Sequence, residues 1–252
     1  MATWIAHLRI ADNLLLSIPG LNARYFAYGS LAPDCGRHIA DEHRFIPPKE
    51  ISHFVIHEDD RPIFQDLRFY REHLDGLRLI DDPERYSFLL AYFTHLTIDG
   101  LWYEWIAEAS RRDYAKLIAE NGHEAWWMMK DDWYGLDIQY VMDHQESLFW
   151  REILPQDKFP ILLPSQDTLA VEEQIEFIKG FYSNPPLDLL ERNHFPYLNK
   201  TTMDRFVSDA TSTVEMIFQE IAAKDLMEDV DCSLQRLPEG LLIPYNGPIC
   251  DR

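Results

Sequence analysis

Hydrophobic residues recur along most of the chain at helical spacing rather than in alternation. In residues 4–15, apolar side chains stand three and four positions apart, which predicts an amphipathic helix ending near Pro19-Gly20. β-branched alternation is nearly absent, so we expect no sheet and assign the chain to the all-α class. The further helices that we expect cover residues 22–31, 61–74, 82–109, 112–121, 136–150, 169–182 and 201–223.

Proline-rich segments separate these helices. Pro47-Pro48 marks one loop, residues 153–166 form an irregular connection, and the tail from about residue 229 is rich in proline and glycine. A chain of 252 residues is long enough for one large core. We therefore expect a single helical domain over residues 1–252 with an irregular tail.

The net charge is −20, from 43 acidic and 23 basic residues. This balance repels phosphate backbones, so we expect no nucleic-acid partner, and it suits cation binding. The three cysteines have no regular spacing, which favours a reducing compartment over a disulfide framework. The amino terminus lacks the pattern of a signal peptide, and no apolar run approaches the ~18 residues of a membrane span. We therefore expect a cytoplasmic protein without a transmembrane segment.

A histidine and an aspartate share one face of the predicted helix at 82–109. His95 and Asp99 are four residues apart, and the residues around them are very apolar. An ionised aspartate buried there needs a cation or a donor, and imidazole and carboxylate are both zinc ligands. Alone, the pair favours a structural hydrogen bond in a core.

Three residues earlier in the chain shift this balance toward a metal site. His7 lies on the first predicted helix, Asp34 follows Pro33 at a helix end, and His53 follows the Pro47-Pro48 loop. Each has an ordinary interpretation, since a lone histidine usually has a structural partner and Asp34 could cap a helix. Their conjunction with His95 and Asp99 predicts a metal cluster.

In order, His7, Asp34, His53 and His95-x-x-x-Asp99 resemble the zinc-dependent phospholipase C family. Its relatives include the amino-terminal domain of glycosylphosphatidylinositol-specific phospholipase D and the zinc-dependent single-strand nucleases. The resemblance covers about residues 1–105. It implies a multi-helix orthogonal bundle that holds up to three zinc ions.

The resemblance also implies the role of each ligand. Asp34, His53, His95 and Asp99 would hold one zinc ion, and Asp99 would bridge to a second zinc ion completed by His7. The family's terminal amine also ligates the second metal. Here that amine belongs to Ala2 if Met1 is removed, and we expect the Ala2 amine and carbonyl to be ligands.

The family's third zinc site is incomplete in this sequence. Tyr103 and Trp105 stand where a histidine is expected after Asp99. Downstream, Asp132 and Asp137 supply carboxylates without a paired histidine; they could bind a metal weakly, line a pocket or cap a helix. His123 and His144 are substitutes, although we expect both to be surface residues. Together with Tyr103, Trp102 completes this set of residues for a third metal or a pocket.

The resemblance implies a zinc-dependent phosphoester hydrolase, or phosphodiesterase, that uses a metal-activated water on a small phosphoester or phospholipid-like substrate. Asp34 is the candidate to orient or deprotonate the water, with Asp99 as the second catalytic residue. Several aromatic residues are candidates to line a pocket for an apolar or choline-like group, although core packing is their more ordinary role. These are Trp4, Trp102, Trp126, Trp127, Trp133 and Tyr134.

Other readings stay open. The chain could be a helical protein that keeps the metal cluster for stability or sensing without catalysis. Mixed histidine and carboxylate ligands also suit iron, manganese or nickel. No His-Asp dipeptide, GxSxG or HExxH motif occurs, and an acidic neighbour at Asp34 argues against a reactive Cys35 thiolate. The sequence does not indicate an oligomeric state.

Overall fold

The computed structural model describes residues 1–39, 44–223, 230–238, 240–246 and 249–250. Helices dominate this part of the chain, so the all-α class is confirmed. The longer helices are α1 (Trp4–Ser17), α2 (Ala23–Leu31), α4 (Asp66–His73), α5 (Pro83–Trp102), α8 (His123–Asp143), α9 (Thr168–Ser183) and α11 (Lys200–Ala222). The shorter ones are α3 (Lys49–Ser52), α6 (Glu108–Asp113), α7 (Ala115–Asn121) and α10 (Leu187–Leu190), with 3-10 turns η1 (Ala32–Asp34) and η5 (Ser233–Arg236) and π-helical turns η3 (Tyr103–Ala107) and η4 (Phe149–Ile153).

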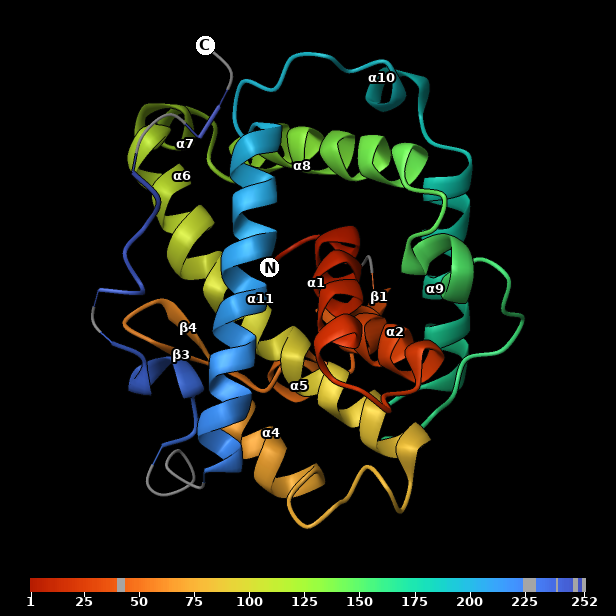
Figure 1. Cartoon of the computed structure of the whole chain (residues 1–252). Helices are drawn as coiled ribbons and strands as arrows, with labels where there is room; N and C mark the ends of the chain where they lie inside the picture. Colours follow the sequence, from red (N-terminus) through yellow and green to blue (C-terminus); the bar gives the residue numbers. More distant parts are fainter. Residues whose placement is uncertain (40–43, 224–229, 239, 247–248, 251–252) are drawn as a thin grey trace.

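Helix α5 is the central element of the core. Every residue from Ser87 to Trp102 is buried, because the helix is apolar on all sides and other helices cover it. Its start is fixed by Asp82, whose side chain accepts from the Arg85 N–H, and by Pro83 in the first turn. Figure 1 shows α5 behind α11, which stands across the face, while α8 lies across the upper end of α11.

Helix α2 packs very closely against α5. A Cβ placed on Gly29 would lie 2.1 Å from the carbonyl oxygen of Phe88, so only glycine permits this approach. The end of α2 and the turn η1 are thereby held beside the middle of α5. This contact brings Ser30 and Asp34 to the level of His95.

Two short hairpins correct the prediction that no sheet would form. Strand β1 (Arg37–Ile39) pairs with β2 (Arg44–Ile46), and β3 (Val55–Glu58) pairs with β4 (Arg61–Phe64), both antiparallel. The predicted helix at 61–74 is therefore wrong in its first turn and right only from Asp66. The cause is the turn Asp59-Asp60, which has positive φ at both residues, the geometry that closes a tight hairpin.

Helix α8 begins earlier than predicted. The sequence predicts a helix over 136–150, whereas α8 runs from His123 to Asp143 and a π-helical turn η4 follows later. Aromatic and charged residues lie on all sides of its first half and leave no apolar stripe, so hydrophobic periodicity does not reveal this part of the helix. The predicted helix at 82–109 is continuous but widens into a π-helical turn at Tyr103–Ala107.

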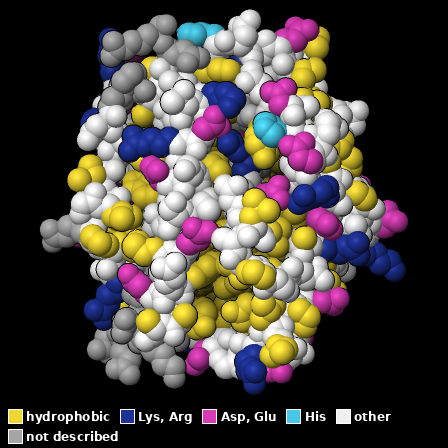
Figure 2. All heavy atoms as spheres, in the orientation of Figure 1, with side chains coloured by type: hydrophobic (Ala, Val, Ile, Leu, Met, Phe, Trp, Pro, Cys, Tyr) yellow, Lys and Arg dark blue, Asp and Glu magenta, His cyan; other side chains and the backbone are white. Residues whose placement is uncertain are grey.

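The predicted helix at 112–121 is wrong at its start, because α6 continues to Asp113 and α7 begins at Ala115 after a break at Tyr114. The other predicted helices agree with the structure. Helices α1, α2, α9 and α11 match the expected ranges within a few residues, and the connection at 153–166 is largely irregular. Within the described residues, no helix combines the length and apolarity needed to cross a bilayer. In the face shown in Figure 2, acidic side chains are scattered singly among other residues.

Candidate metal centre

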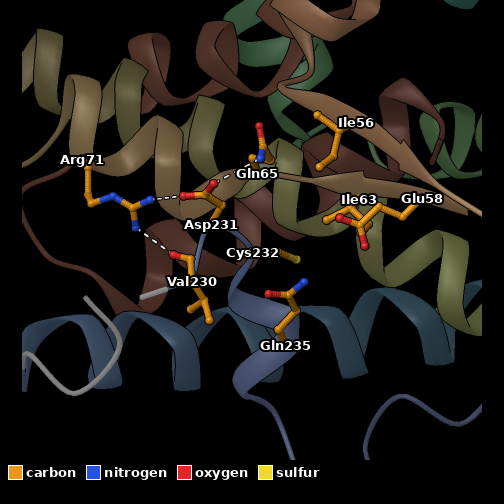
Figure 3. Close-up of a pocket in the computed structure, with 9 residues that line it drawn as sticks. All are labelled: Ile56, Glu58, Ile63, Gln65, Arg71, Val230, Asp231, Cys232 and Gln235. Carbon is orange, nitrogen blue, oxygen red and sulfur yellow. Dashed lines mark hydrogen bonds and ion pairs between the residues drawn. The ribbon is translucent and has the colours of Figure 1, made fainter. Parts of the chain in front are cut away.

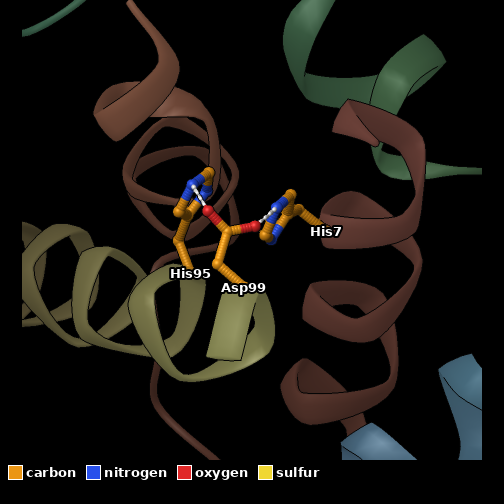
Figure 4. A group of neighbouring side chains, drawn as sticks. All are labelled: His7, His95 and Asp99. Atoms are coloured by element: carbon orange, nitrogen blue, oxygen red, sulfur yellow. Dashed lines mark ion pairs between the residues drawn. The ribbon is translucent and has the colours of Figure 1, made fainter. Parts of the chain in front are cut away.

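Asp99 lies fully buried on α5 with its two carboxylate oxygens facing different partners. Oδ1 lies 3.4 Å from Nε2 of His7, which comes from α1. Oδ2 lies 3.5 Å from Nε2 of His95, one helical turn earlier, and 3.7 Å from Nε2 of His53. Figure 4 shows the carboxylate between the rings of His7 and His95.

These distances are long for hydrogen bonds but suit ligands of one ion. A good N–H···O bond spans about 2.7–3.2 Å. With metal–ligand bonds of about 2.1 Å, two ligand atoms on a tetrahedral zinc ion stand about 3.4 Å apart. Two sets of potential ligand atoms lie within 4.8 Å of one another: His7, His95 and Asp99, and Asp34, His53 and His95. Both sets have the nitrogen and oxygen donors that zinc accepts.

Several lone pairs in the cluster have no hydrogen-bonding partner. Among the described residues, Nε2 of His95, Oδ2 of Asp99 and both ring nitrogens of His7 are buried without one. Leaving such groups unpaired in a protein interior costs about 1–3 kcal/mol each. A bound cation would satisfy the imidazole nitrogens and the carboxylate oxygen together, so the residues present fit a metal ion.

Neighbouring groups orient two of the histidines. The Nδ1 of His95 donates to the carbonyl oxygen of Ser30 at 2.8 Å, which leaves Nε2 as the lone-pair nitrogen facing Asp99. The Nδ1 of His53 lies 2.8 Å from the Ser52 hydroxyl, and its Nε2 lies 3.1 Å from Oδ1 of Asp34. Such partners are typical of metal-binding histidines, because they fix the tautomer and the ring plane.

His7 stacks directly on His95. The ring centroids are 3.8 Å apart and the planes differ by 6°. Burial, and then the charge of His95, lower the pKa of His7 to about 4, so His7 is neutral at pH 7. Burial alone would also lower the pKa of His95, but the charge of Asp99, the contact with Asp99, the charge of Asp34 and the hydrogen bond to Ser30 together outweigh burial and raise the pKa. Neutral His7 has the protonation state that a ligand needs.

Both carboxylates of the cluster are ionised. Burial works to raise the pKa of Asp99, but the charge of His95 and the contacts with His7 and His95 hold it well below its ordinary value. Burial likewise opposes ionisation of Asp34, and the hydrogen bond from His53 with the charge of His95 lowers its pKa. The cluster thus places two anionic carboxylates beside the neutral imidazole of His7, which is a donor set that a cation accepts.

The amino-terminal segment closes the cluster. The backbone N–H of Ala2 donates to Oδ1 of Asp99 at 2.9 Å. Thr3 caps α1, and its hydroxyl donates to Asp137 on α8 at 2.8 Å. The other oxygen of Asp137 accepts from Tyr182 on α9 at 2.8 Å. Asp137 therefore positions the segment that carries Ala2 and His7.

The residues proposed for a third metal or a pocket have other partners. Asp132 is fully buried and accepts from Arg192 at 3.0 Å and from the Tyr197 N–H at 2.6 Å. Asp132 and Asp137 both lie inside α8, so neither caps the helix that follows it. Within the described residues, neither joins a group of three close metal-binding side chains. Trp102 and Tyr103 line a cavity instead.

A cavity of about 590 Å³ opens beside the cluster and is lined by Ala2, Asp34 and His53. Aromatic side chains from α1, η3, α8 and α9 form much of its wall. They include the six residues named above as candidates for such a pocket, Trp4, Trp102, Trp126, Trp127, Trp133 and Tyr134. His123, at the start of α8, also lines the cavity, whereas His144 stacks on Tyr140.

A second pocket, of about 520 Å³, lies between the β3–β4 hairpin, α4 and η5 (Figure 3). Two of its charged residues, Arg71 and Asp231, pair with each other. Arg71 donates to the Val230 carbonyl at 2.8 Å and to Asp231, and Asp231 also accepts from Gln65. Neither of the two sets of potential metal ligands found among the described residues lies in this pocket. The cluster around Asp99 is therefore the candidate metal site.

Sequence reasoning missed the residues that orient the cluster. Ser30, Ser52 and Thr3 act through a carbonyl or a hydroxyl, and the sequence gives no signal for such contacts. Asp137 was singled out as a carboxylate, but its contact with Thr3 depends on the packing of α8 against α1.

Comparisons of the chain with family models, curated proteins and solved structures find no match.

Proposed function

We propose that this protein is a metal-dependent phosphoester hydrolase that holds two divalent ions, zinc by preference, and shares the bundle of the zinc-dependent phospholipase C family. The observation that carries the proposal is the convergence on Asp99 of His7, His53 and His95, each from a different segment. Their Nε2 atoms lie 3.4–3.7 Å from its oxygens. The long spacing supports a shared cation more than a network of hydrogen bonds.

The two oxygens of Asp99 suggest how two ions would be divided. Oδ1, with His7 and, once Met1 is removed, the Ala2 amine, would hold one ion, and Oδ2, with Asp34, His53 and His95, would hold the other. When bound, such a pair of ions lowers the pKa of a nearby water and polarises a phosphoryl group.

Asp34 is the residue best placed to handle a proton. Its side chain is 10% exposed and lines the cavity, whereas Asp99 is fully buried. Its lowered pKa keeps it ionised, so it can accept a proton from the attacking water, and His53 at 3.1 Å holds it in orientation. The aromatic walls of the cavity would keep bulk water from the reacting phosphorus.

Elemental analysis of the purified protein, with an Asp99→Ala variant, tests the proposal. We expect roughly two zinc ions per chain and the loss of both in the variant, because one carboxylate serves each ion. Turnover of aryl phosphomonoesters and phosphodiesters should fall by at least about a hundredfold. Asp66→Ala, which removes another buried carboxylate, is the matched control and should retain the metal.

Two results would contradict the proposal: wild-type protein without a divalent ion, or Asp99→Ala with a full complement. The intact mass of the same sample tests the role of Ala2. Removal of Met1 would leave the Ala2 amine beside Asp99, whereas active, metal-loaded protein that retains Met1 would exclude that amine as a ligand.

A non-catalytic metal protein is the second candidate. Asp132 and Asp137 accept hydrogen bonds from protein groups, so they are not free to bind the family's third metal. This favours a protein that holds a metal without catalysis. Stoichiometric zinc without turnover of either class of phosphoester would favour this alternative over the hydrolase.

A further inference from the structure

The cavity beside the cluster has a charge opposite to that of the protein. The chain has a net charge of −20, yet Asp34 is the one acidic residue among the described residues that line the cavity. Three cationic residues line it: Lys49, Arg111 and Lys130. A cationic hollow on an acidic protein attracts anions that the rest of the surface repels.

Two of these cations form no ion pair in the described part of the chain, although the charge of Asp34 acts on Lys130. Arg111 pairs with Glu108, but no described carboxylate pairs with Lys49 or Lys130. The Nζ of Lys49 lies 3.1 Å from the thioether of Met1, and the Nζ of Lys130 lies 4.3 Å from the ring centre of Trp127. Burial, and then the charge of Lys49, lower the pKa of Lys130, so the two ammonium groups destabilise each other.

Two tryptophans of the cavity wall carry indole N–H groups without acceptors in the described structure. The indole N–H groups of Trp102 and Trp133 are buried, and neither has an acceptor among the described residues. Both residues line the cavity. Ammonium groups only donate, so the ligand that suits Lys49 and Lys130 carries oxygen acceptors and negative charge.

We propose that Lys49 and Lys130 form an anion-binding subsite, and that the cavity takes an anionic phosphoester with an aromatic or apolar organic group. The anionic binding follows from the two lysines, whereas its assignment to a substrate rests on the proposed hydrolase. The subsite disfavours a choline-like group, because a quaternary ammonium would meet two lysines. The aromatic wall instead accommodates the flat or apolar part of the ester.

Calorimetric titration of the protein as purified tests this subsite with three probes. Phenylphosphonate carries the anion and an aromatic ring, inorganic phosphate carries the anion alone, and benzyltrimethylammonium carries a ring with the opposite charge. We expect phenylphosphonate to bind more tightly than either of the others. Lys49→Gln and Lys130→Gln should each weaken phenylphosphonate binding by about tenfold or more.

The matched control is Lys116→Gln on α7, whose side chain is 89% exposed and lies near Glu120. It should leave the affinity unchanged, and Lys130→Arg should keep most of it. Tighter binding of benzyltrimethylammonium, equal binding of inorganic phosphate, or lysine variants that bind like wild type would overturn the subsite. Zinc analysis of the same samples separates the two proposals: zinc without lysine-dependent binding removes only the subsite, and lysine-dependent binding without a metal removes only the hydrolase.

Discussion

Two buried carboxylates near α5 have opposite surroundings. Asp66 at the start of α4 and Asp99 on α5 are 1% and 0% exposed. Asp66 accepts from the N–H groups of Leu67 and Ser233 and from the hydroxyl of Thr97 at 2.7–2.9 Å, and it also accepts from the Ser233 hydroxyl. Asp99 has one such donor, the Ala2 N–H, and its Oδ2 has none in the described residues.

This contrast shows that burial alone does not identify a metal site. Ordinary donors complete the Asp66 region, and burial still raises the pKa of Asp66. Imidazole nitrogens at longer range surround Asp99, and its pKa is held low. The Oδ2 of Asp99 has no donor within hydrogen-bonding distance among the described residues and could accept a cation, whereas Asp66 is already satisfied.

The largest expected effect is that zinc stabilises the fold of wild type and of Asp66→Ala, but not that of Asp99→Ala. Asp66→Ala should lower the free energy of unfolding by about 3 kcal/mol, because buried donors lose their acceptor. Asp99→Ala should lower it by about 8 kcal/mol, which is about 4 kcal/mol for each of the two ions lost, when free zinc is a thousandfold above both dissociation constants. Urea unfolding with zinc and with a chelator measures both values.

The chelator should separate the two variants. It should leave the effect of Asp66→Ala unchanged and bring Asp99→Ala close to wild type, since wild type then also lacks the ion. If the effect of Asp99→Ala were equal in zinc and in chelator, the two carboxylates would belong to the same structural class.

Asp137 gives the next effect, a dependence of stability on pH. Burial raises its pKa to about 7, and the bonds from Tyr182 and Thr3 oppose this shift. The folded state therefore binds a proton that the unfolded state releases near pH 4, so this contribution is complete below about pH 4 and is lost as the pH rises to about 7. The slope should reach about −1.4 kcal/mol per pH unit in the free energy of unfolding.

Asp137→Asn removes this titration and keeps a side chain that can bond both hydroxyls. The difference in free energy of unfolding between variant and wild type, measured in chelator from pH 4 to pH 8, should therefore rise in favour of the variant. A difference independent of pH would show that Asp137 is ionised throughout, as a carboxylate with sufficient donors would be.

Much of the helical frame could be predicted from the sequence. Strong apolar periodicity and clear end signals, such as Asp82-Pro83 for α5 and Pro19-Gly20 after α1, locate the helices that carry His7, His95 and Asp99. The hairpins could not be predicted, because strands of three or four residues are too short to show alternation. Helix α8 was misplaced at its start because its aromatic residues surround it on all sides.

Only the order of the candidate ligands along the chain, which resembles that of the zinc-dependent phospholipase C family, predicted that they lie close to one another. The reason for their approach is local: Gly29 lets α2 contact α5, and the hydrogen bond between Thr3 and Asp137 fixes the start of α1. The lysines of the cavity gave no signal, because a single lysine in a helix or loop is usually solvated. The hydrogen bond that Arg192 donates to Asp132 joins residues 60 apart in the chain, so the sequence alone does not indicate it.

The smallest expected effect sharpens the comparison within α5 itself. Thr97 stands between His95 and Asp99 in sequence, but its hydroxyl donates to Asp66 at 2.8 Å, since residues two apart on a helix face different ways. Thr97→Val should lower the free energy of unfolding by about 1 kcal/mol and leave the zinc content unchanged.

Thr94→Val is the matched control, because Thr94 is equally buried on the same helix and its hydroxyl donates only to the Leu90 carbonyl in the described structure. It should cost less than Thr97→Val, since the Leu90 carbonyl remains part of the helix, whereas Asp66 loses a donor to its charge. Zinc loss in Thr97→Val as complete as in Asp99→Ala would mean that Asp66 and Asp99 form one coupled network. Retention of zinc with the smaller stability change would place the metal chemistry on the Asp99 face of α5.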